Sequence, residues 1–172
     1  LVDALAGSRA TWKVVASDMP LGLVVADGPL IEAVANRQPG APLAREAEIA
    51  WVLGELNRRG VEDVVWITTD VHYTAAHHYA PEHAGFRDFR PFWEFVSGPL
   101  NAGGFGAVPL DPTFGPETRF LRVPPRAGAS PLEGFQNFGE MNIDAATREL
   151  RVDLRDSSGE SLWSVTLSPQ AR

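Results

Sequence analysis

The clearest pattern of hydrophobic and polar positions lies near the end of the chain. Residues 150–155 (LRVDLR) and 162–167 (LWSVTL) alternate between apolar and polar side chains, and the turn-forming stretch 156–160 (DSSGE) separates them. A period of two predicts β-strands with one buried face and one solvent-exposed face. Residues 138–144 predict a further strand, which a turn over 145–148 joins to the next one. The last third of the chain therefore predicts an antiparallel β-meander.

The first part of the chain shows the order strand, helix, strand. Residues 12–17 (WKVVAS) predict a short strand, and a long connection rich in proline and glycine follows over 18–42. Residues 44–59 predict a helix that ends at basic residues and Gly60. Its apolar positions recur near the helical spacing: Ala47, Ala50, Trp51, Leu53 and Leu56. The run 64–68 (VVWIT) predicts a strand buried on both faces, so the whole segment is typical of a parallel βαβ unit.

Three other segments complete the predicted fold. Residues 1–9 are the tail of a helix or a linker, and residues 92–97 (FWEFVS) predict another strand. Residues 98–106 (GPLNAGGFG) have too much backbone freedom for a regular element and predict a structural or rim loop. We therefore expect an α/β fold in which a mixed sheet is followed by the antiparallel meander, within one domain over residues 1–172.

The composition excludes several classes of protein. A length of 172 residues suffices for one domain with a real core, and 44% hydrophobic with 22% charged residues is typical of a soluble globular protein. No apolar run approaches the roughly 18 residues of a membrane-spanning helix, so we expect no membrane span. The chain has no cysteine, which excludes disulfides and thiolate metal sites.

The charge balance bears on the partners of the chain. A formal net charge of −7 gives no general attraction for nucleic acid or for an anionic membrane, so we expect no nucleic-acid partner. The same charge disfavours anionic substrates on average. Phosphate chemistry would therefore need a local positive source, and metal ions are one candidate.

The strongest candidate site follows the most apolar predicted strand. Asp70 and His72 lie two residues apart at its carboxyl end, the edge where open α/β sheets bind ligands. In an extended chain both side chains would point to the same side, and a carboxylate with an imidazole suits Zn, Fe or Mn. The alternative is a solvated turn or a helix cap, because Asp-x-His alone is a weak motif.

Further histidines and arginines offer weaker candidates, and the sequence alone assigns no catalytic residue. His77 and His78 could bind phosphate oxygens, support the metal site as ligands, or act as a general acid; the alternative is two polar residues on a loop or helix start. Arg87, Arg90 and Arg119 could contact phosphate, although surface arginines are common. No Gly-x-Ser-x-Gly elbow occurs, so nothing supports a serine hydrolase.

Several of these segments together resemble the PhoD-like alkaline phosphatase/phosphodiesterase family of metallophosphatases. The most specific stretches are 64–73 (VVWITTDVHY) and 92–103 (FWEFVSGPLNAG). The likeness also includes the strand at 12–15, the helix from residue 44, residues 111–116 (DPTFGP) and the final strands, and so covers nearly the whole chain.

The resemblance implies a fold, a reaction and a site. It implies an αββα sandwich that hydrolyses phosphate mono- and diesters at alkaline pH, with small phosphate esters as substrates. It implies two metal ions, calcium and iron, and export through the twin-arginine route to the periplasm or outside the cell. Asp70 and His72 are metal ligands by this resemblance, and His77 matches a position where the family tends to have histidine, without an assigned role.

The resemblance also implies that part of the enzyme lies elsewhere. The family's other ligands lie on strands that precede the segment matching Trp12, and the chain starts at Leu1 without an initiator Met. We therefore expect the C-terminal half of the sandwich, in a fragment that binds metal incompletely and is inactive alone. Two alternatives remain open: a non-catalytic β-rich interaction module, and a nuclease-like metallophosphoesterase.

Overall fold

The computed structural model describes residues 1–170 of the chain. Within this range the helices are α1 (Val2–Gly7) and α2 (Arg45–Arg58), with short 3₁₀ helices η1 (Pro81–His83) and η2 (Pro131–Glu133). The strands, in chain order, are β1 (Lys13–Ala16), β2 (Ala26–Asp27), β3 (Leu30–Ile31), β4 (Val64–Thr68), β5 (Thr74–Tyr79), β6 (Phe92–Val96), β7 (Pro116–Arg122), β8 (Asn137–Ile143), β9 (Leu150–Asp156) and β10 (Ser161–Leu167).

The first sheet is mixed and has the strand order β1-β4-β6-β5-β7. Strands β1, β4 and β6 run parallel, whereas β5 lies antiparallel to both β6 and β7. Helix α2 lies in the connection between β1 and β4, so the predicted βαβ unit is confirmed. Val65 and Trp66 belong to cores on opposite faces of β4 and are both nearly fully buried, as expected for a strand that is covered on both sides.

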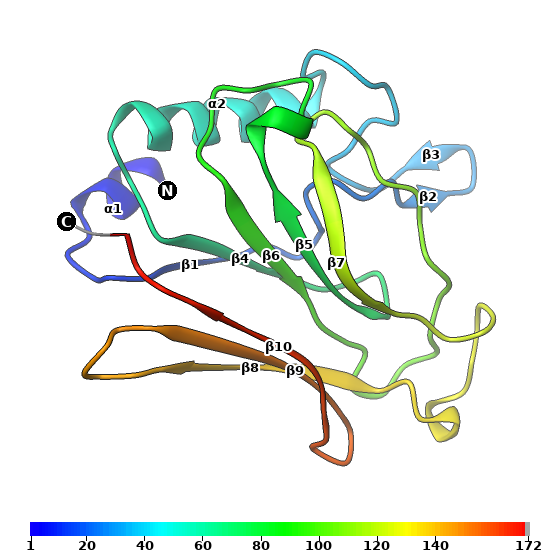
Figure 1. The fold of residues 1–172 in the computed structure, drawn as a ribbon. Helices are drawn as coiled ribbons and strands as arrows, with labels where there is room; N and C mark the ends of the chain where they lie inside the picture. The colour runs from blue at the N-terminus through cyan, green and yellow to red at the C-terminus, as the bar shows by residue number, and fades with distance from the viewer. Residues whose placement is uncertain (171–172) are drawn as a thin grey trace.

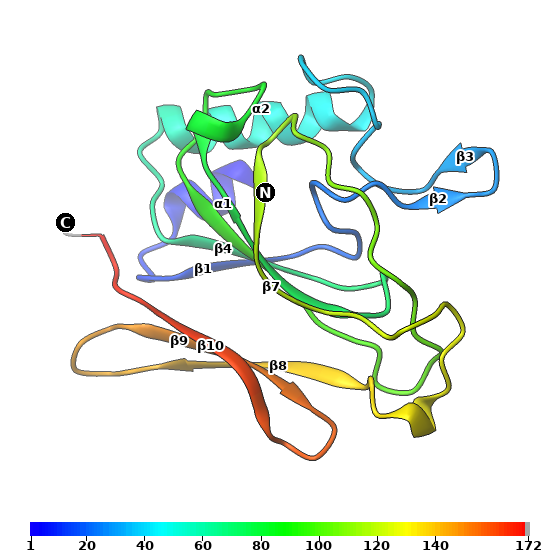
Figure 2. The same cartoon turned by 45° about the vertical axis from the view of Figure 1, so that its right-hand side comes forward.

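The second sheet contains the last three strands in the antiparallel order β10-β9-β8, so the predicted meander is confirmed. This sheet lies against one face of the mixed sheet, and α1 and α2 cover the other face (Figure 1, Figure 2). The core between the two sheets is apolar and consists of Trp12, Val65, Ala76, Phe95, Leu150, Val152 and Leu154. The molecule is thus a mixed α/β fold with a mixed sheet and a three-stranded antiparallel sheet, and β2 and β3 form a separate two-stranded antiparallel pair.

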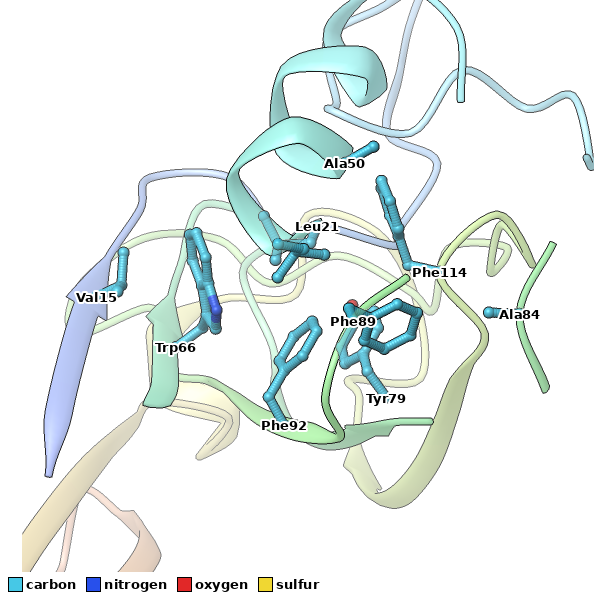
Figure 3. Packing of buried hydrophobic residues seen from close by; sticks show 10 residues of the cluster. Val15, Leu21, Ala50, Trp66, Tyr79, Ala84, Phe89, Phe92 and Phe114 are labelled. Atoms are coloured by element: carbon cyan, nitrogen blue, oxygen red, sulfur yellow. The ribbon is translucent and has the colours of Figure 1, made fainter. Parts of the chain in front are cut away.

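The core under the helices is rich in aromatic residues (Figure 3). Tyr79 and Phe92 stack with ring centroids 4.5 Å apart, and Trp66 lies beside them on β4. The other buried members are Val15, Leu21, Ala50, Leu53, Ala84, Phe89 and Phe114. Full burial of a side chain of this size contributes roughly 1.5–3 kcal/mol, so this cluster fixes the helices and the loop at Leu21 against the sheet.

Strands β5 and β7 were not expected from the sequence. The alternative reading of His77 and His78 as loop or helix-start residues is wrong in its secondary structure, because both lie in β5. This strand (TAAHHY) lacks β-branched alternation, and it is stabilised by pairing with a neighbour on each side. Strand β7 lies at an edge of the sheet, where its proline at the first position needs no hydrogen-bonding partner.

The apolar stripe of α2 also differs in part from the prediction. Ala50, Leu53 and Leu56 are buried as expected, but Ala47 is exposed and Trp51 is 60% exposed. The first turn instead buries Glu46, whose carboxylate accepts hydrogen bonds from the backbone N–H groups of Asn36 and Leu43. No helix within residues 1–170 has the length and apolar character needed to cross a bilayer.

Candidate metal centre

The carboxyl ends of β1, β4 and β6 meet at one edge of the mixed sheet. Residues 69–73 leave β4 at this edge and lead into β5, which is separated from β4 by β6. The N–H of Thr69 donates to the carbonyl of Asp18 after β1 (3.1 Å), and the N–H of Ser97 after β6 donates to the carbonyl of Thr68 (3.1 Å). The chain around Asp70 and His72 is therefore tied to the strand ends on both sides, where α/β sheets bind ligands.

The backbone at this edge is not extended as the sequence argument assumed. Asp70 and His72 both adopt left-handed conformations, with φ of 69° and 57°. Such angles are uncommon outside glycine, although Asp and His tolerate them better than most residues, and they cluster at functional sites. Val71, between them, is 4% exposed and packs in a core with Leu23 and Tyr73. The assumed strand geometry is thus wrong, and a turn anchored by Val71 presents the two polar side chains.

Asp70 and His72 nevertheless border the same open cleft, which has a volume of about 550 Å³. The side chain of Asp70 is exposed and that of His72 is half-buried, so neither lies sealed inside the apolar core. Val71 between them also lines the cleft. The remaining lining residues come from the segment around β2 and β3 (Val24, Val25, Ala26, Asp27 and Glu32) and from the loop Phe105, Gly106, Ala107, Val108 and Pro109.

One hydrogen bond fixes the chemistry of the His72 imidazole. Nδ1 lies 2.6 Å from the carbonyl oxygen of Gly103, and a carbonyl can only accept, so Nδ1 carries the proton. In the neutral ring Nε2 then keeps its lone pair. Metal-binding histidines are commonly oriented in this way, with the second ring nitrogen donating to a backbone carbonyl.

The glycine-rich loop forms the rim beside His72, in agreement with the sequence interpretation. The rings of Phe105 and His72 lie 4.9 Å apart, and the N–H of Phe105 donates to the carbonyl of His72 (3.3 Å). The loop begins at Gly98, whose φ of 134° is rarely open to other residues. The imidazole is therefore held by a backbone hydrogen bond at its edge and by an aromatic ring beside it.

In the described part of the chain, the Asp, Glu, Lys and Arg side chains that line the cleft are all acidic: Asp27, Glu32 and Asp70. Such a site attracts cations and repels phosphate unless cations are present. Within residues 1–170, no three His, Asp or Glu side chains lie close enough together to hold one ion. The described part of the chain thus offers a carboxylate and an imidazole of suitable chemistry, without a complete ligand set.

His77 and His78 do not line this cleft. His77 is 1% exposed, its Nδ1 lies 3.3 Å from the Thr118 hydroxyl, and burial lowers its pKa to about 4. The ring of His78 lies 5.0 Å from that of Trp93, and burial is the main cause that lowers its pKa. The structure does not bring these two histidines together with Asp70 and His72, so their role in phosphate binding or in support of the metal site stays a prediction.

The arginines considered as phosphate ligands have other partners. Arg90 forms an ion pair with Glu62, and Arg119 pairs with Glu117 at 2.8 Å. Arg87 donates to a backbone carbonyl at 3.2 Å. None of the three lines the cleft, which agrees with the reading of ordinary surface arginines.

Sequence reasoning missed two features of this region. One is the far wall of the cleft with Asp27 and Glu32, which depends on how a long loop folds back. The other is Glu94, a fully buried carboxylic acid in the centre of β6 whose pKa is raised to about 7, mainly by burial. A charged residue within the apolar run FWEFV was a visible signal of a buried polar network.

Comparison with known proteins completes the assignment. A search of curated proteins found no match for the chain. The sequence model described as PhoD-like phosphatase matches residues 1–154, which is most of the chain and includes Asp70, His72 and Glu94. The chain therefore belongs to the PhoD-like phosphatase family.

Proposed function

We propose that this chain carries part of the metal centre of a PhoD-like phosphoesterase, with Asp70 and His72 as metal ligands. Membership of the family indicates a hydrolase acting on phosphate esters, and PhoD-like phosphatases are generally metal-dependent. The observation that carries the proposal is the contact between His72 Nδ1 and the Gly103 carbonyl at 2.6 Å. It leaves Nε2 as the free ligand atom of a residue that shares a cleft with the Asp70 carboxylate.

The donor set fits the ions that the family resemblance implies, calcium and iron. Carboxylate oxygen suits both, and imidazole nitrogen suits iron. When bound, the two ions would supply positive charge for the phosphoryl oxygens and activate the attacking water. The part of this chain is to orient the imidazole and to place a carboxylate in the same cleft. The rim ring of Phe105 screens one side of the imidazole from solvent.

The substrates that we propose are small phosphate mono- and diesters. The cleft is open to solvent at Asp70, and among residues 1–170 its lining includes no lysine or arginine that could hold a polyanion. A nuclease-like activity is less favoured, because long nucleic acids need several lysine or arginine contacts to phosphate. We also propose a periplasmic or secreted location, which follows from the family resemblance.

The ligand set points to a divided site. Two ligands cannot hold an ion tightly, so we propose that the remaining ligands come from another part of the enzyme, which would complete the αββα sandwich. The chain alone should then bind metal weakly and hydrolyse little. A non-catalytic interaction module would share the fold, but it would have no use for an oriented imidazole in the same cleft as a carboxylate.

Two assays on the purified chain test the proposal. Mn²⁺ titrated into ¹⁵N-labelled protein should broaden the amide signals of residues 70–72, and Asp70→Asn or His72→Gln should abolish the effect. His83→Gln is the matched control, because His83 lies on η1 outside the cleft. Absence of broadening at 70–72 would refute the ligand assignment. With p-nitrophenyl phosphate, Ca²⁺ and iron, we expect no turnover above the buffer blank, and robust turnover would refute the divided site.

A further inference from the structure

A closed hydrogen-bond network surrounds the buried carboxyl group of Glu94. The Tyr79 hydroxyl donates to Oε2 at 2.6 Å, and the backbone N–H of Leu21 donates to Oε1 at 2.8 Å. The N–H of Gly22 in turn donates to the Tyr79 hydroxyl at 3.0 Å. The network therefore connects two strands of the mixed sheet, β5 and β6, to the backbone of the loop that follows β1.

The loop is pressed closely against these strands. A Cβ atom on Gly22 would lie 2.8 Å from Cγ of Pro116 and 2.9 Å from the Tyr79 hydroxyl oxygen, so no side chain fits there. Leu21 itself is fully buried in the aromatic core under the helices (Figure 3). Burying a carboxyl group is costly, and here both of its oxygens accept hydrogen bonds, one of them from the loop backbone.

The anchored residues lead directly into the cleft. Val24 and Asp27, which follow Gly22 within five residues, belong to the wall that faces Asp70 and His72. The N–H of Val24 donates to the carbonyl of Pro109 at 2.9 Å, and Pro109 also lines the cleft.

Further contacts link residues 22 and 23 to residues 110 and 111, which directly follow the other wall of the cleft, residues 105–109. The N–H of Asp111 donates to the carbonyl of Gly22 at 2.9 Å, and Leu23 pairs with Leu110 in an isolated bridge. A displacement of residues 21–22 would therefore be transmitted to both loop walls, 24–27 and 105–109, and not to one alone.

We propose that Glu94 is a positioning residue for the candidate metal centre: through Leu21 and Tyr79 it holds the loop 20–27 that forms the wall opposite Asp70 and His72. The inference rests on the proposed function and deepens it, because it names a residue outside the cleft that sets the cleft's shape. Glu94 itself touches neither Asp70 nor His72, and it has no role in proton transfer or metal binding in this account.

The test uses Mn²⁺ as a probe of distance between the two sides of the cleft. In the unmodified chain, Mn²⁺ held at residues 70–72 should also broaden the amide signals of residues 24–27. In Glu94→Gln, the broadening of the signals of residues 70–72 should persist. The ratio of the broadening at residues 24–27 to the broadening at residues 70–72 should fall at least two-fold. The protection of the Leu21 and Gly22 amides against hydrogen exchange should fall at least ten-fold in the same variant.

Two further variants keep the test decisive if Glu94→Gln folds poorly. Tyr79→Phe keeps the carboxylate and removes only the hydroxyl, so exchange should accelerate at Gly22 more than at Leu21. Asp153→Asn is the matched control, since Asp153 is a carboxylate 1% exposed in β9 and outside the cleft. Its loss of charge should leave the ratio of broadening between the two walls unchanged.

The outcomes separate this inference from the proposed function. Unchanged ratios and unchanged amide protection in both Glu94→Gln and Tyr79→Phe would overturn the positioning role while the ligand assignment stands. An equal fall in the broadening ratio in Asp153→Asn would also overturn the positioning role of Glu94, because general destabilisation would then explain the effect. Absence of any Mn²⁺ effect at 70–72 in the unmodified chain would overturn the ligand assignment and this inference together.

Discussion

The two faces of the mixed sheet carry different kinds of buried side chains. Towards the meander, β6 and β5 present Phe95 and Ala76, which belong to the apolar core between the two sheets. Towards the helices, the same strands present Glu94 and Tyr79, which hold loop backbone by hydrogen bonds, and the buried His77. We call the meander side the apolar face, and we call the helix side, which combines an aromatic core with this hydrogen-bond network, the polar face. The network on the polar face fixes the loop backbone that leads into the cleft. A sheet can thus separate stability from the placement of a site by alternating side chains along a single strand.

The largest expected effect tests the apolar face. Leu154 is fully buried between the sheets, so Leu154→Ala should lower the free energy of unfolding by about 2–5 kcal/mol through lost transfer energy and a cavity. Urea unfolding measures this loss, which should be independent of pH because no ionisable group is involved. A loss below about 1 kcal/mol, or one that varies with pH, would contradict the division between the faces.

The second test concerns the polar face and Glu94. The unfolded chain releases the Glu94 proton near the ordinary pKa of 4.5, whereas burial keeps it bound in the folded state until the pKa of about 7. The unfolded state binds fewer protons in this window, so stability falls as pH rises through it, by about 3 kcal/mol in total. The difference in unfolding free energy between the unmodified chain and Glu94→Gln should change by that amount between these pH values. If the unfolding free energies of the unmodified chain and of Glu94→Gln changed in parallel with pH, the raised pKa of Glu94 would be refuted.

The third test concerns His77 on the same face, whose pKa is shifted in the opposite direction to that of Glu94. Burial lowers its pKa from 6.5 to about 4, so the folded state binds fewer protons than the unfolded state between these values. The His77 contribution is present above pH 6.5 and is lost as pH falls towards 4, by up to about 3 kcal/mol. Acid unfolding of His77→Gln should therefore begin at lower pH than that of the unmodified chain. An unchanged acid midpoint would show that His77 is accessible to solvent.

The smallest expected effect lies outside both faces. Trp51 is 60% exposed on the outer side of α2, so Trp51→Gln should change the free energy of unfolding by less than about 0.5 kcal/mol. Thermal unfolding followed by circular dichroism gives the value. A loss comparable to that of Leu154→Ala would mean that α2 packs on a different face.

Elements that follow from a local sequence pattern could be predicted, whereas elements that depend on long-range pairing could not. The meander and the βαβ unit follow from local patterns, because the alternation in 150–155 and the apolar run 64–68 indicate strands. The patterns do not give the burial of every residue: Asp153 is 1% exposed and Ile67 is 37% exposed. Strand β5 could not be predicted, since its small and polar residues become a strand only through pairing with β6 and β7. Asp70 and His72 border one cleft, but not through the extended geometry assumed from the sequence, because a local pattern does not reveal two left-handed residues around a buried valine. Their role as ligands of a common ion stays a prediction.

The site walls were beyond sequence reasoning for a related cause. Glu94 and Gly22 are 72 positions apart, and the network between them depends on the packing of a long loop whose composition shows only that it is irregular. The interruption of the apolar run by Glu94 was a signal of a buried polar group, but its partners in the loop could be identified only from the fold.

The account depends most directly on the His72 imidazole. Zn²⁺ titrated into protein with ¹⁵N-labelled histidine should shift the Nε2 resonance of His72 while Nδ1 keeps the proton that it donates to the carbonyl of Gly103. Asp70→Asn should weaken this shift. Loss of the Nδ1 proton on addition of Zn²⁺, or no change in the resonance of either ring nitrogen of His72, would contradict the assignment of Asp70 and His72 as a metal-binding pair.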